Sequence, residues 1–435
     1  GVSGRVDGVR WRPRDLGGGH LLVRYEHPDF LWPWSGYFAV LLEVDAPGRT
    51  FTGRATGVLE VDVRAWGPDG SRRQTLELPI TAAIVPPPPR RQRLLWDQFH
   101  SIAYPSGYFP RDDLQVQTDM LDWTGDHLHT NFRRAYDVLR NEGYFVEVLT
   151  TDWTCFDARN YAALLVVDPE DEVFPQEAAK LENDVRLQGL SLIVLADWYS
   201  EPLVRSVRFF DDNTRVYWEA VTGGANVPAI NDFLATFGIQ FSDAVFDGTW
   251  TLERSPKGRG EKIVPFLSGN AIAAFPRGGF LKAAPQLKER RAAGKLRGAG
   301  PPKLQGPPRI LGAVQACHTS PHGCPEEDSD RSGRVVVYGD SSCLDSWGKA
   351  DSLCSDLLLG MVEVAAQGAS AATTLGLEGP LQEPFAIRPG RQPTRRADSE
   401  LSKYSNVLQD VRLPDAPRRE AGESCKWTRR LRTPA

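Results

Sequence analysis

Residues 1–85 show the alternation of apolar and polar positions that is typical of β-strands. The predicted strands are YFAVLLEV (37–44), VLEVDV (58–63) and LELPITAAIV (76–85). The tetrapeptide GPDG at 67–70 has the composition of a turn and lies between two of them. Strands at this spacing predict a small antiparallel β-sandwich. Because the sequence opens abruptly at Gly1, we expect this sandwich to be truncated at its start.

A proline-rich stretch over residues 86–93 is the clearest domain boundary in the chain. It consists of four prolines followed by RRQR, a composition that predicts a stiff polyproline linker with a basic end. A simple spacer is favoured over a peptide ligand for an SH3-type domain, because no binding context accompanies the prolines.

The hydrophobic pattern changes after residue 93, where strands and helices begin to alternate. Apolar runs predict strands at 94–96, 144–149, 163–168, 190–197 and 334–340. Helices are predicted from Thr130 to Gly143, from Pro175 to Gly189 and over 228–237. This alternation predicts a doubly wound, mostly parallel α/β domain over residues 94–365, of a flavodoxin-like or amidotransferase-like kind.

Two stretches lack such a period. Residues 281–309 are basic and rich in Gly, Pro and Ala, which predicts a flexible surface insertion. After the α/β domain the chain turns polar, apart from residues 404–411, and a disordered tail is predicted over 366–435.

The chain also carries a series of long, specific motifs. They are LLWDQFHS, YPSGYFPRDDL, LDWTGDHLHTNFR, GYFVEVL, LSLIVLADWYS, FFDDNTRVYW, TGGANVPAIN and RVVVYGDSSCLD, with a weaker KYSNVLQDV in the tail. Together they closely resemble the region C-terminal to the catalytic domain in the site-1 protease family, the subtilisin-like, membrane-anchored serine endopeptidases of the secretory pathway. The resemblance covers most of residues 1–365.

The resemblance implies a parent protein whose protease domain precedes Gly1 and whose membrane-spanning helix lies beyond this chain. Such a parent cleaves membrane-bound precursors, for example sterol-regulatory transcription factors, in the lumen of the Golgi or endoplasmic reticulum. The implied partners are the protease domain of the same protein, a lumenal cofactor protein, and membrane-protein substrates that the parent binds.

Charge and composition narrow the functional classes. Lys and Arg number 51 against 56 Asp and Glu, for a net charge of −5, so no nucleic-acid partner is expected. No run of about 18 apolar residues is present, so no transmembrane helix is expected. The chain starts at Gly1 without a signal peptide and is expected to be a piece of a longer protein.

The six cysteines bear on the compartment. Cys343 and Cys354 bracket a short polar loop and could close it as a disulfide. The resembled family has cysteines in the corresponding places, which favours an oxidising lumen. Cys317 and Cys324 lie with two histidines within eight residues, which is too tight for a finger-like zinc site. A local disulfide or free thiols are favoured there.

The predicted strands end in acidic residues, which are candidates for ligand binding. Asp97, Asp168 and Asp197 each stop a strand, and Asp340 follows another. His100 lies close after the first of these. Because ligands of open α/β sheets bind at the carboxyl ends of strands, a small-molecule-binding or degenerate amidotransferase-like domain is one alternative function.

No catalytic residue is assigned. A subtilisin-like triad needs a characteristic serine turn and an H-G-T histidine, and neither is present, so the chain is expected to lack peptidase activity of its own. The sequence Gly339-Asp340-Ser341 resembles a turn of SGNH-type esterases, yet no histidine follows His322. Cys155 lacks the glycine-flanked elbow of an amidotransferase nucleophile.

No cofactor and no metal site are predicted. Asp126, His127 and His129 could ligate a metal, but a loop that caps the next helix is the favoured interpretation. No nucleotide-binding glycine motif is present.

Aromatic residues gather in two predicted loops. They are Trp32, Trp34, Tyr104, Tyr108 and Phe109. Such clusters serve as interface plugs or as recognition surfaces. An interface with the protease domain is favoured, and a carbohydrate-binding module is the alternative. The sequence thus predicts a non-catalytic scaffolding and interaction region.

Overall fold

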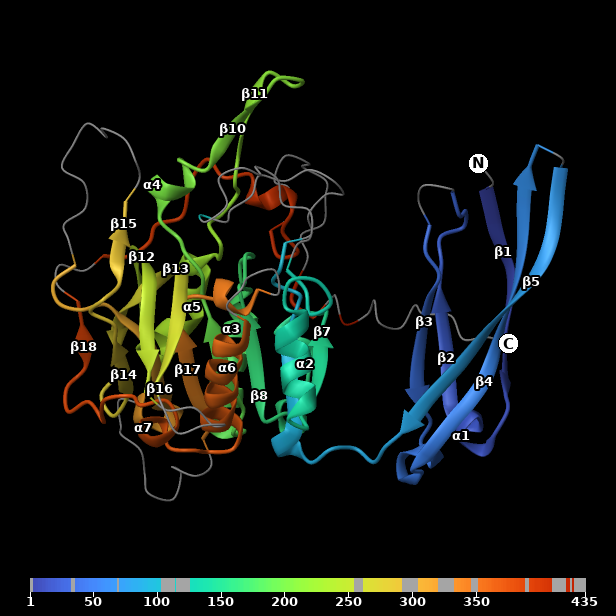
Figure 1. Ribbon diagram of the computed structural model, residues 1–435, viewed down its shortest axis with the longest axis horizontal. Coiled ribbons are helices and arrows are strands. Elements are labelled where there is room, and N and C mark those ends of the chain that lie inside the picture. The colour runs from blue at the N-terminus through green and yellow to red at the C-terminus, as the bar shows by residue number, and fades with distance from the viewer. Residues whose placement is uncertain are drawn as a thin grey trace. The chain divides into compact units, whose positions relative to one another are not determined.

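The chain folds into two compact units. The computed structural model describes residues 3–32, 36–68, 70–102, 114, 126–253, 261–291, 304–319, 332–345, 351–387, 391–408, 420–422 and 425. The first unit spans residues 1–88 with 425–435, and the second spans 89–424 (Figure 1).

The first unit is built from two antiparallel sheets. Strands β1 (Ser3–Pro13), β4 (Gly53–Gly67) and β5 (Gly70–Ile84) form one sheet in the order β1-β4-β5, and β2 (Leu21–Glu26) pairs with β3 (Ala39–Val44). A short helix, α1 (Leu16–Gly19), joins β1 to β2. Alternate residues of β1, β2 and β4 form the core, which confirms the predicted antiparallel β-fold.

The second unit is centred on a seven-stranded sheet. Its order is β14-β16-β17-β9-β8-β6-β7. The strands are β6 (Arg93–Asp97), β7 (Phe145–Leu149), β8 (Ala163–Val167), β9 (Ser191–Leu195), β14 (Phe280–Ala283), β16 (Arg309–Gln315) and β17 (Arg334–Tyr338). The five strands from β17 to β7 are parallel, whereas β14 and β16 run antiparallel at one edge. The predicted mostly parallel α/β domain is therefore confirmed.

Helices cover both faces of this sheet (Figure 1). On one face, α2 (Arg133–Asn141) and α6 (Asp351–Ala366) pack on residues such as Trp96, Leu165 and Ile193. On the other face, α3 (Pro175–Leu187) and α5 (Val227–Leu234) pack on the strand residues that alternate with these along the sequence. Because successive strand residues point to opposite faces, a strand covered on both sides is apolar throughout. This is why the buried strands are continuous apolar runs.

Further strands flank the central sheet. Strands β12 (Gln240–Leu252), β13 (Lys262–Phe275), β15 (Lys288–Arg290) and β18 (Phe385–Ala386) form a four-stranded sheet in the order β15-β12-β13-β18. The hairpin β10 (Arg208–Asp211) and β11 (Val216–Glu219) follows helix α4 (Glu201–Val204). A short helix, α7 (Ala371–Thr374), follows α6.

Two sequence predictions in the α/β domain need correction. Helix α2 begins at Arg133 rather than Thr130, because the Thr130 hydroxyl donates to the His127 carbonyl at 3.1 Å inside the preceding turn. The segment 281–309, expected to be flexible throughout, contributes most of β14 and all of β15. Both strands pair with longer strands, and such pairing is invisible in local composition. Residues 292–303 lie outside the described part.

Part of the tail that was predicted to be disordered, over 366–435, is ordered, whereas residues 388–390, 409–419, 423–424 and 426–435 lie outside the described part. Residues 371–387 form α7 and β18, and residues 391–408, which we call the strap, run along the second unit. The strap is held largely by ion pairs and hydrogen bonds, together with a small apolar contact of Leu401 and Tyr404 with Ile102 and Val221. Its low overall hydrophobicity therefore did not reveal its order. Among the described residues, no helix is both long and apolar enough to cross a membrane.

Candidate functional site

The parallel strands change winding direction between β6 and β8. Numbered in chain order, the five parallel strands follow the flavodoxin-like sequence 2-1-3-4-5, so the chain moves outward in both directions from β6. In folds of this kind, ligands bind beyond the carboxyl ends of the strands at this switch point. The candidate site is therefore formed by the loops after β6 and β8.

The switch point holds a buried imidazole between two carboxylates. His100 Nδ1 lies 2.7 Å from Asp97 Oδ2, and its Nε2 lies 3.4 Å from Glu177 Oε2. Trp153 also contacts both acids: its indole N–H donates to Asp97 Oδ2 at 3.1 Å and its backbone N–H to Glu177 Oε1 at 2.6 Å. All four residues are buried. Both ring nitrogens of His100 therefore lie beside carboxylates inside the cluster.

The electrostatics of the cluster favour a charged histidine. Burial alone would lower the pKa of His100, but the carboxylates of Asp97 and Glu177 outweigh burial and hold that pKa well above its ordinary value of 6.5. A base that already carries a proton and has both ring nitrogens beside carboxylates cannot accept a proton from a nucleophile. This arrangement suits a structural ion cluster.

The loops after β6 and β8 are joined directly. The backbone N–H groups of Glu170 and Asp171 both donate to the His100 carbonyl, at 3.0 and 2.9 Å. The Ile102 N–H donates to Glu170 Oε2 at 3.0 Å. Asp168, the first residue after β8, adopts a left-handed conformation with φ of 53°, and its N–H donates to Leu195 O.

The strap closes over the same loops. Asp171 accepts hydrogen bonds from the Ser405 hydroxyl at 2.5 Å and from the Asn406 backbone N–H at 2.6 Å. The Asn406 amide donates in turn to the Phe99 carbonyl at 2.7 Å. Burial raises the pKa of Asp171. In the described part of the chain, groups at the carboxyl end of the sheet are thus bonded to the chain's own strap.

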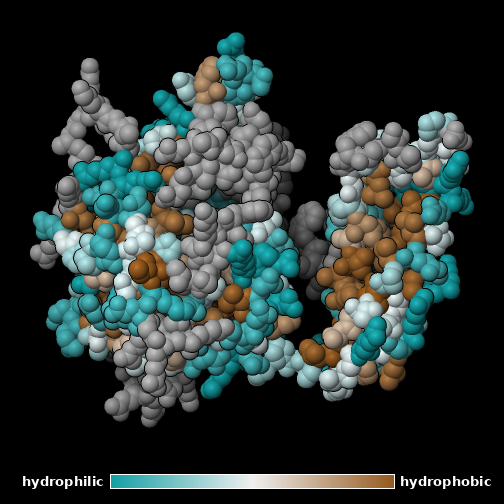
Figure 2. All heavy atoms as spheres, in the orientation of Figure 1, coloured by the Kyte–Doolittle hydropathy of each residue, from teal (hydrophilic) through white to brown (hydrophobic). Residues whose placement is uncertain are grey.

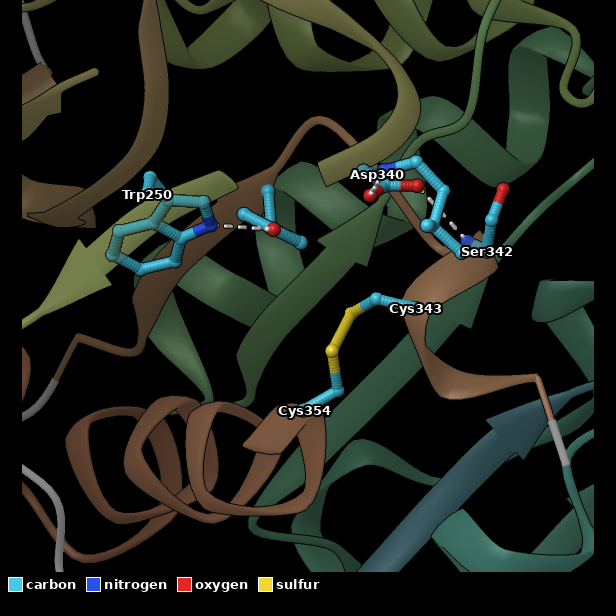
Figure 3. The surroundings of a disulfide bond; sticks show 7 residues. Trp250, Asp340, Ser342, Cys343 and Cys354 are labelled. Atoms are coloured by element: carbon cyan, nitrogen blue, oxygen red, sulfur yellow. Dashed lines mark hydrogen bonds between the residues drawn. A yellow bond between two sulfur atoms is a disulfide. The ribbon is translucent and has the colours of Figure 1, made fainter. Parts of the chain in front are cut away.

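A second cluster lies at the ends of β9 and β17. Both Ser341 and Ser342 donate their hydroxyls to Asp197 Oδ2, at 3.2 and 2.7 Å. Asp340 accepts backbone N–H groups from Leu267 at 2.7 Å and from Ser342 at 3.2 Å (Figure 3). The two serine hydroxyls therefore face a carboxylate rather than an imidazole, so this cluster lacks the base that an esterase needs.

Asp340 is fully buried at this point. Burial raises its pKa from an ordinary 3.8 to about 7, and the backbone donors offset only part of that effect. The close approach that buries it depends on glycine: a Cβ on Gly269 would lie 2.1 Å from the Gly339 carbonyl oxygen. The β12–β13 hairpin can lie against the end of β17 only because these positions have no side chain.

A disulfide borders the second cluster. Cys343 and Cys354 are bonded, with their Cα atoms 5.8 Å apart, and they link the turn after β17 to helix α6 (Figure 3). Cys155, Cys317 and Cys425 are also in disulfides, and no free cysteine occurs in the described part of the chain. Such cysteine usage fits an oxidising compartment.

Removal of this disulfide gives a testable prediction. The variant Cys343→Ala/Cys354→Ala is expected to lose about 2–3 kcal/mol of unfolding free energy, because the bridge closes a short loop in the unfolded chain. The bonded residues are separated by 11 positions. Urea unfolding of the variant and of the unsubstituted chain measures the difference, and identical unfolding midpoints would contradict the prediction.

The structure places four of the five sequence-predicted ligand residues in two clusters and leaves Asp168 outside both, at the end of β8. It brings Asp97 and His100 together, and it links Asp197 with Asp340 through Ser342. Ligand binding by these residues stays a prediction. Of the predicted interface aromatics, Trp32 is half exposed and stacks on Phe30 with ring centroids 5.6 Å apart. Trp34, Tyr104, Tyr108 and Phe109 lie outside the described residues, and the interface role is likewise a prediction.

Sequence reasoning missed several residues of the site. Glu177 is the third residue of α3, where a carboxylate that accepts the Phe174 N–H at 2.8 Å is a recognisable helix-start feature. Trp153 and Asp171 gave no local signal, because their roles depend on tertiary contacts. For Ser405 and Asn406 a signal was present: KYSN is an isolated stretch of family resemblance inside a polar tail.

The fold and its closed strand ends define a class of protein: an Ig-like β-unit followed by a GATase-like α/β unit. Residues 1–87 match the family described as "MBTPS1, third Ig-like domain", and residues 88–376 match "MBTPS1, fourth GATase-like domain". The chain belongs to the site-1 protease family and comprises these two non-catalytic domains.

Curated relatives agree with this assignment. The chain is 40% identical to "Subtilisin-like protease SBT6.1" of Arabidopsis thaliana over 412 residues, covering 94% of this chain and 38% of that protein. It is 38% identical to "Membrane-bound transcription factor site-1 protease" of Homo sapiens over 416 residues, covering 94% of this chain and 37% of that protein. The chain thus spans well under half the length of these relatives.

A solved structure, the "mmIFT52 N-terminal domain", also aligns with the chain. It covers 63% of this chain and 98% of its own, with a TM-score of 0.36 and 12% sequence identity. A similarity at that level carries no argument about function.

Proposed function

We propose that this chain is the scaffolding and interaction region of a site-1-protease-like serine endopeptidase. The parent would process membrane-bound precursors, such as sterol-regulatory transcription factors, in the lumen of the Golgi or endoplasmic reticulum. The chain's partners would be the protease domain of the same protein and a lumenal cofactor protein. Support comes from the family, from the disulfides and from the arrangement of the strand ends.

The observation that carries this proposal is the closure of the switch point. An enzyme of this fold needs an accessible cleft where its reactive groups converge. Here the imidazole of His100 is enclosed by Asp97, Glu177 and Trp153, and the strap covers Asp171. Groups so enclosed stabilise a fold without meeting a substrate.

Larger cavities, of about 900 and 400 Å³, lie at the amino ends of the parallel strands, where Arg334 lines both, rather than at the switch point. The cavity beside the switch point is smaller and gives the alternative of a small-molecule site little support. This cavity, of about 180 Å³, lies between the strap and the loops after β8 and β9, lined by Tyr199, Thr222 and Arg395 among others. Pockets for small-molecule ligands typically enclose about 300–1,000 Å³. The scaffolding role is therefore the better-supported function.

A peptidase assay tests the proposal. The purified chain is expected to show no turnover of peptide substrates, whereas the full-length family protein cleaves them and loses that activity with a serine-reactive inhibitor. Deletion of these residues from the full-length protein should abolish production of active enzyme, because the protease domain would lose its support. Sustained, inhibitor-sensitive cleavage by the isolated chain would refute the proposal.

A further inference from the structure

In the first unit, several apolar side chains lie on the core-facing side of their sheets and yet remain exposed to solvent. Directly opposed residues of an antiparallel pair project to the same side of a sheet. Val23 of β2 and Leu42 of β3 are such a pair. Val23 is 2% exposed and belongs to the core, whereas Leu42 is 38% exposed. Leu42 therefore faces inward and still remains uncovered.

The other sheet has the same property. Leu59 of β4 opposes Leu78 of β5, and the first is fully buried while the second is 40% exposed. Each sheet thus has a strand whose inward side chains lack a cover within the described residues. These residues are Val40, Leu42, Val44, Leu76 and Leu78. Figure 2 shows hydrophobic side chains gathered on this unit over β2 and β3.

Strand β3 is also open along its backbone. In the described part of the chain it pairs with β2 alone, in a sheet of two strands. An edge strand that presents unpaired backbone groups and apolar side chains readily accepts another strand. The described residues of the unit form five strands in two sheets, whereas an immunoglobulin-type sandwich has about seven. The shortage of strands and the uncovered side chains point to the same missing element.

We propose that β3 is a docking edge for an extended segment of the family polypeptide outside these 435 residues. The added strand would extend the β2–β3 sheet through main-chain hydrogen bonds, and its alternate apolar side chains would cover Val40, Leu42 and Val44. The matched relatives are more than twice as long as this chain, and the alignment with it covers 37–38% of their length. A covalently linked donor strand is therefore available in a polypeptide of that length. This inference rests on the proposed scaffolding function and names the surface through which it acts.

Amide hydrogen exchange tests the docking edge in the intact protein. The amides of β3 that point away from β2 are expected to exchange about a hundredfold more slowly in the full-length family protein than in the 435-residue chain, because the added strand would hold their hydrogens. The amides of β4, the central strand of its sheet, serve as an internal reference and should be protected in both forms.

A matched pair of variants separates the inward face from the outward face. Leu42→Lys places a charge on the docking edge, and Leu22→Lys places the same charge on the outward face of the same sheet, at a residue 42% exposed. Both variants should leave the melting temperature of the 435-residue chain nearly unchanged. In the full-length protein, only Leu42→Lys should lower the yield of active enzyme, by about tenfold or more.

The outcomes distinguish this inference from the proposed function. Equal exchange of β3 in both proteins overturns the docking edge, and so does a dimer of the 435-residue chain that Leu42→Lys dissolves. Protection of β3 by the second unit, already present in the 435-residue chain, also overturns it. In each case the scaffolding role stands if the isolated chain lacks peptidase activity. Protected β3 amides together with intrinsic peptidase activity would refute the scaffolding role alone.

Discussion

The variant His100→Ala is expected to lose about 3–5 kcal/mol of the unfolding free energy of the second unit. Asp97 and Glu177 would then remain buried without the positive charge between them. Uncompensated buried charges are among the most destabilising changes in a folded protein. Urea unfolding at pH 7 measures the loss.

His129→Ala is the matched control for this variant. His129 is exposed, lies in the same unit and contacts the ring of Tyr136. Its removal should change the unfolding free energy by no more than about 0.5 kcal/mol. Equal losses in the two variants would contradict the importance of the buried cluster.

The pH dependence of stability should identify the charge on His100. Its folded-state pKa lies above the ordinary 6.5, so the stability it contributes is fully present below pH 6.5 and is lost as pH rises through the folded pKa. The raised pKa of Asp340 acts with the same sign, but its effect ends near pH 7. The unsubstituted chain is expected to lose stability above pH 7, and the His100→Ala variant is not. An unfolding free energy of the unsubstituted chain that stays constant above pH 7 would contradict this prediction.

The variant Arg396→Ala is expected to lose about 2–3 kcal/mol and to release the strap. The Arg396 guanidinium donates to Glu219 at 2.7 Å and to the Ala220 carbonyl at 3.1 Å. Its side chain is only 5% exposed, so its loss leaves the carbonyl without a charged donor. Limited proteolysis should then cut the strap more rapidly, and the amides of Asn406 and Val407 should exchange faster.

Arg395→Ala provides a control one residue away. Arg395 pairs with Glu172 at 2.7 Å and with Asp232 at 2.5 Å, but its side chain is 45% exposed. Exposed ion pairs contribute about 0–1 kcal/mol, so this variant should change stability and proteolysis little. If both variants release the strap equally, burial of the guanidinium is not what holds it.

The sequence was sufficient for the elements that a continuous or alternating apolar pattern encodes. Strands β8, β9 and β17 are buried on both faces, so their residues are apolar apart from Ser191 and Arg334 at the starts of β9 and β17. Helix α3 was predictable at both ends, because Pro175 fixes the backbone at its start and Gly189 takes a left-handed conformation after it. These features are local, and local physics determined them.

What the sequence concealed depends on distant contacts. The strap is polar and rich in arginine, and composition alone predicts disorder for such a segment. Its order comes from partners such as Asp171 and Glu219, which are more than 170 positions away along the chain. Likewise, Asp97 and His100 were predicted to lie together at a strand end, but the acid on the other side of the imidazole, Glu177, comes from α3.

The strap has a consequence for the timing of biosynthesis. The hydrogen bond from Asn406 to Phe99 joins positions 307 residues apart, and contacts of such long range form late in folding. At a typical elongation rate, that length of chain takes roughly 15–60 s to synthesise. During this interval the β6–β8 end of the sheet is exposed in the nascent polypeptide. Chaperones that bind nascent chains would therefore encounter this surface before the protein itself can cover it.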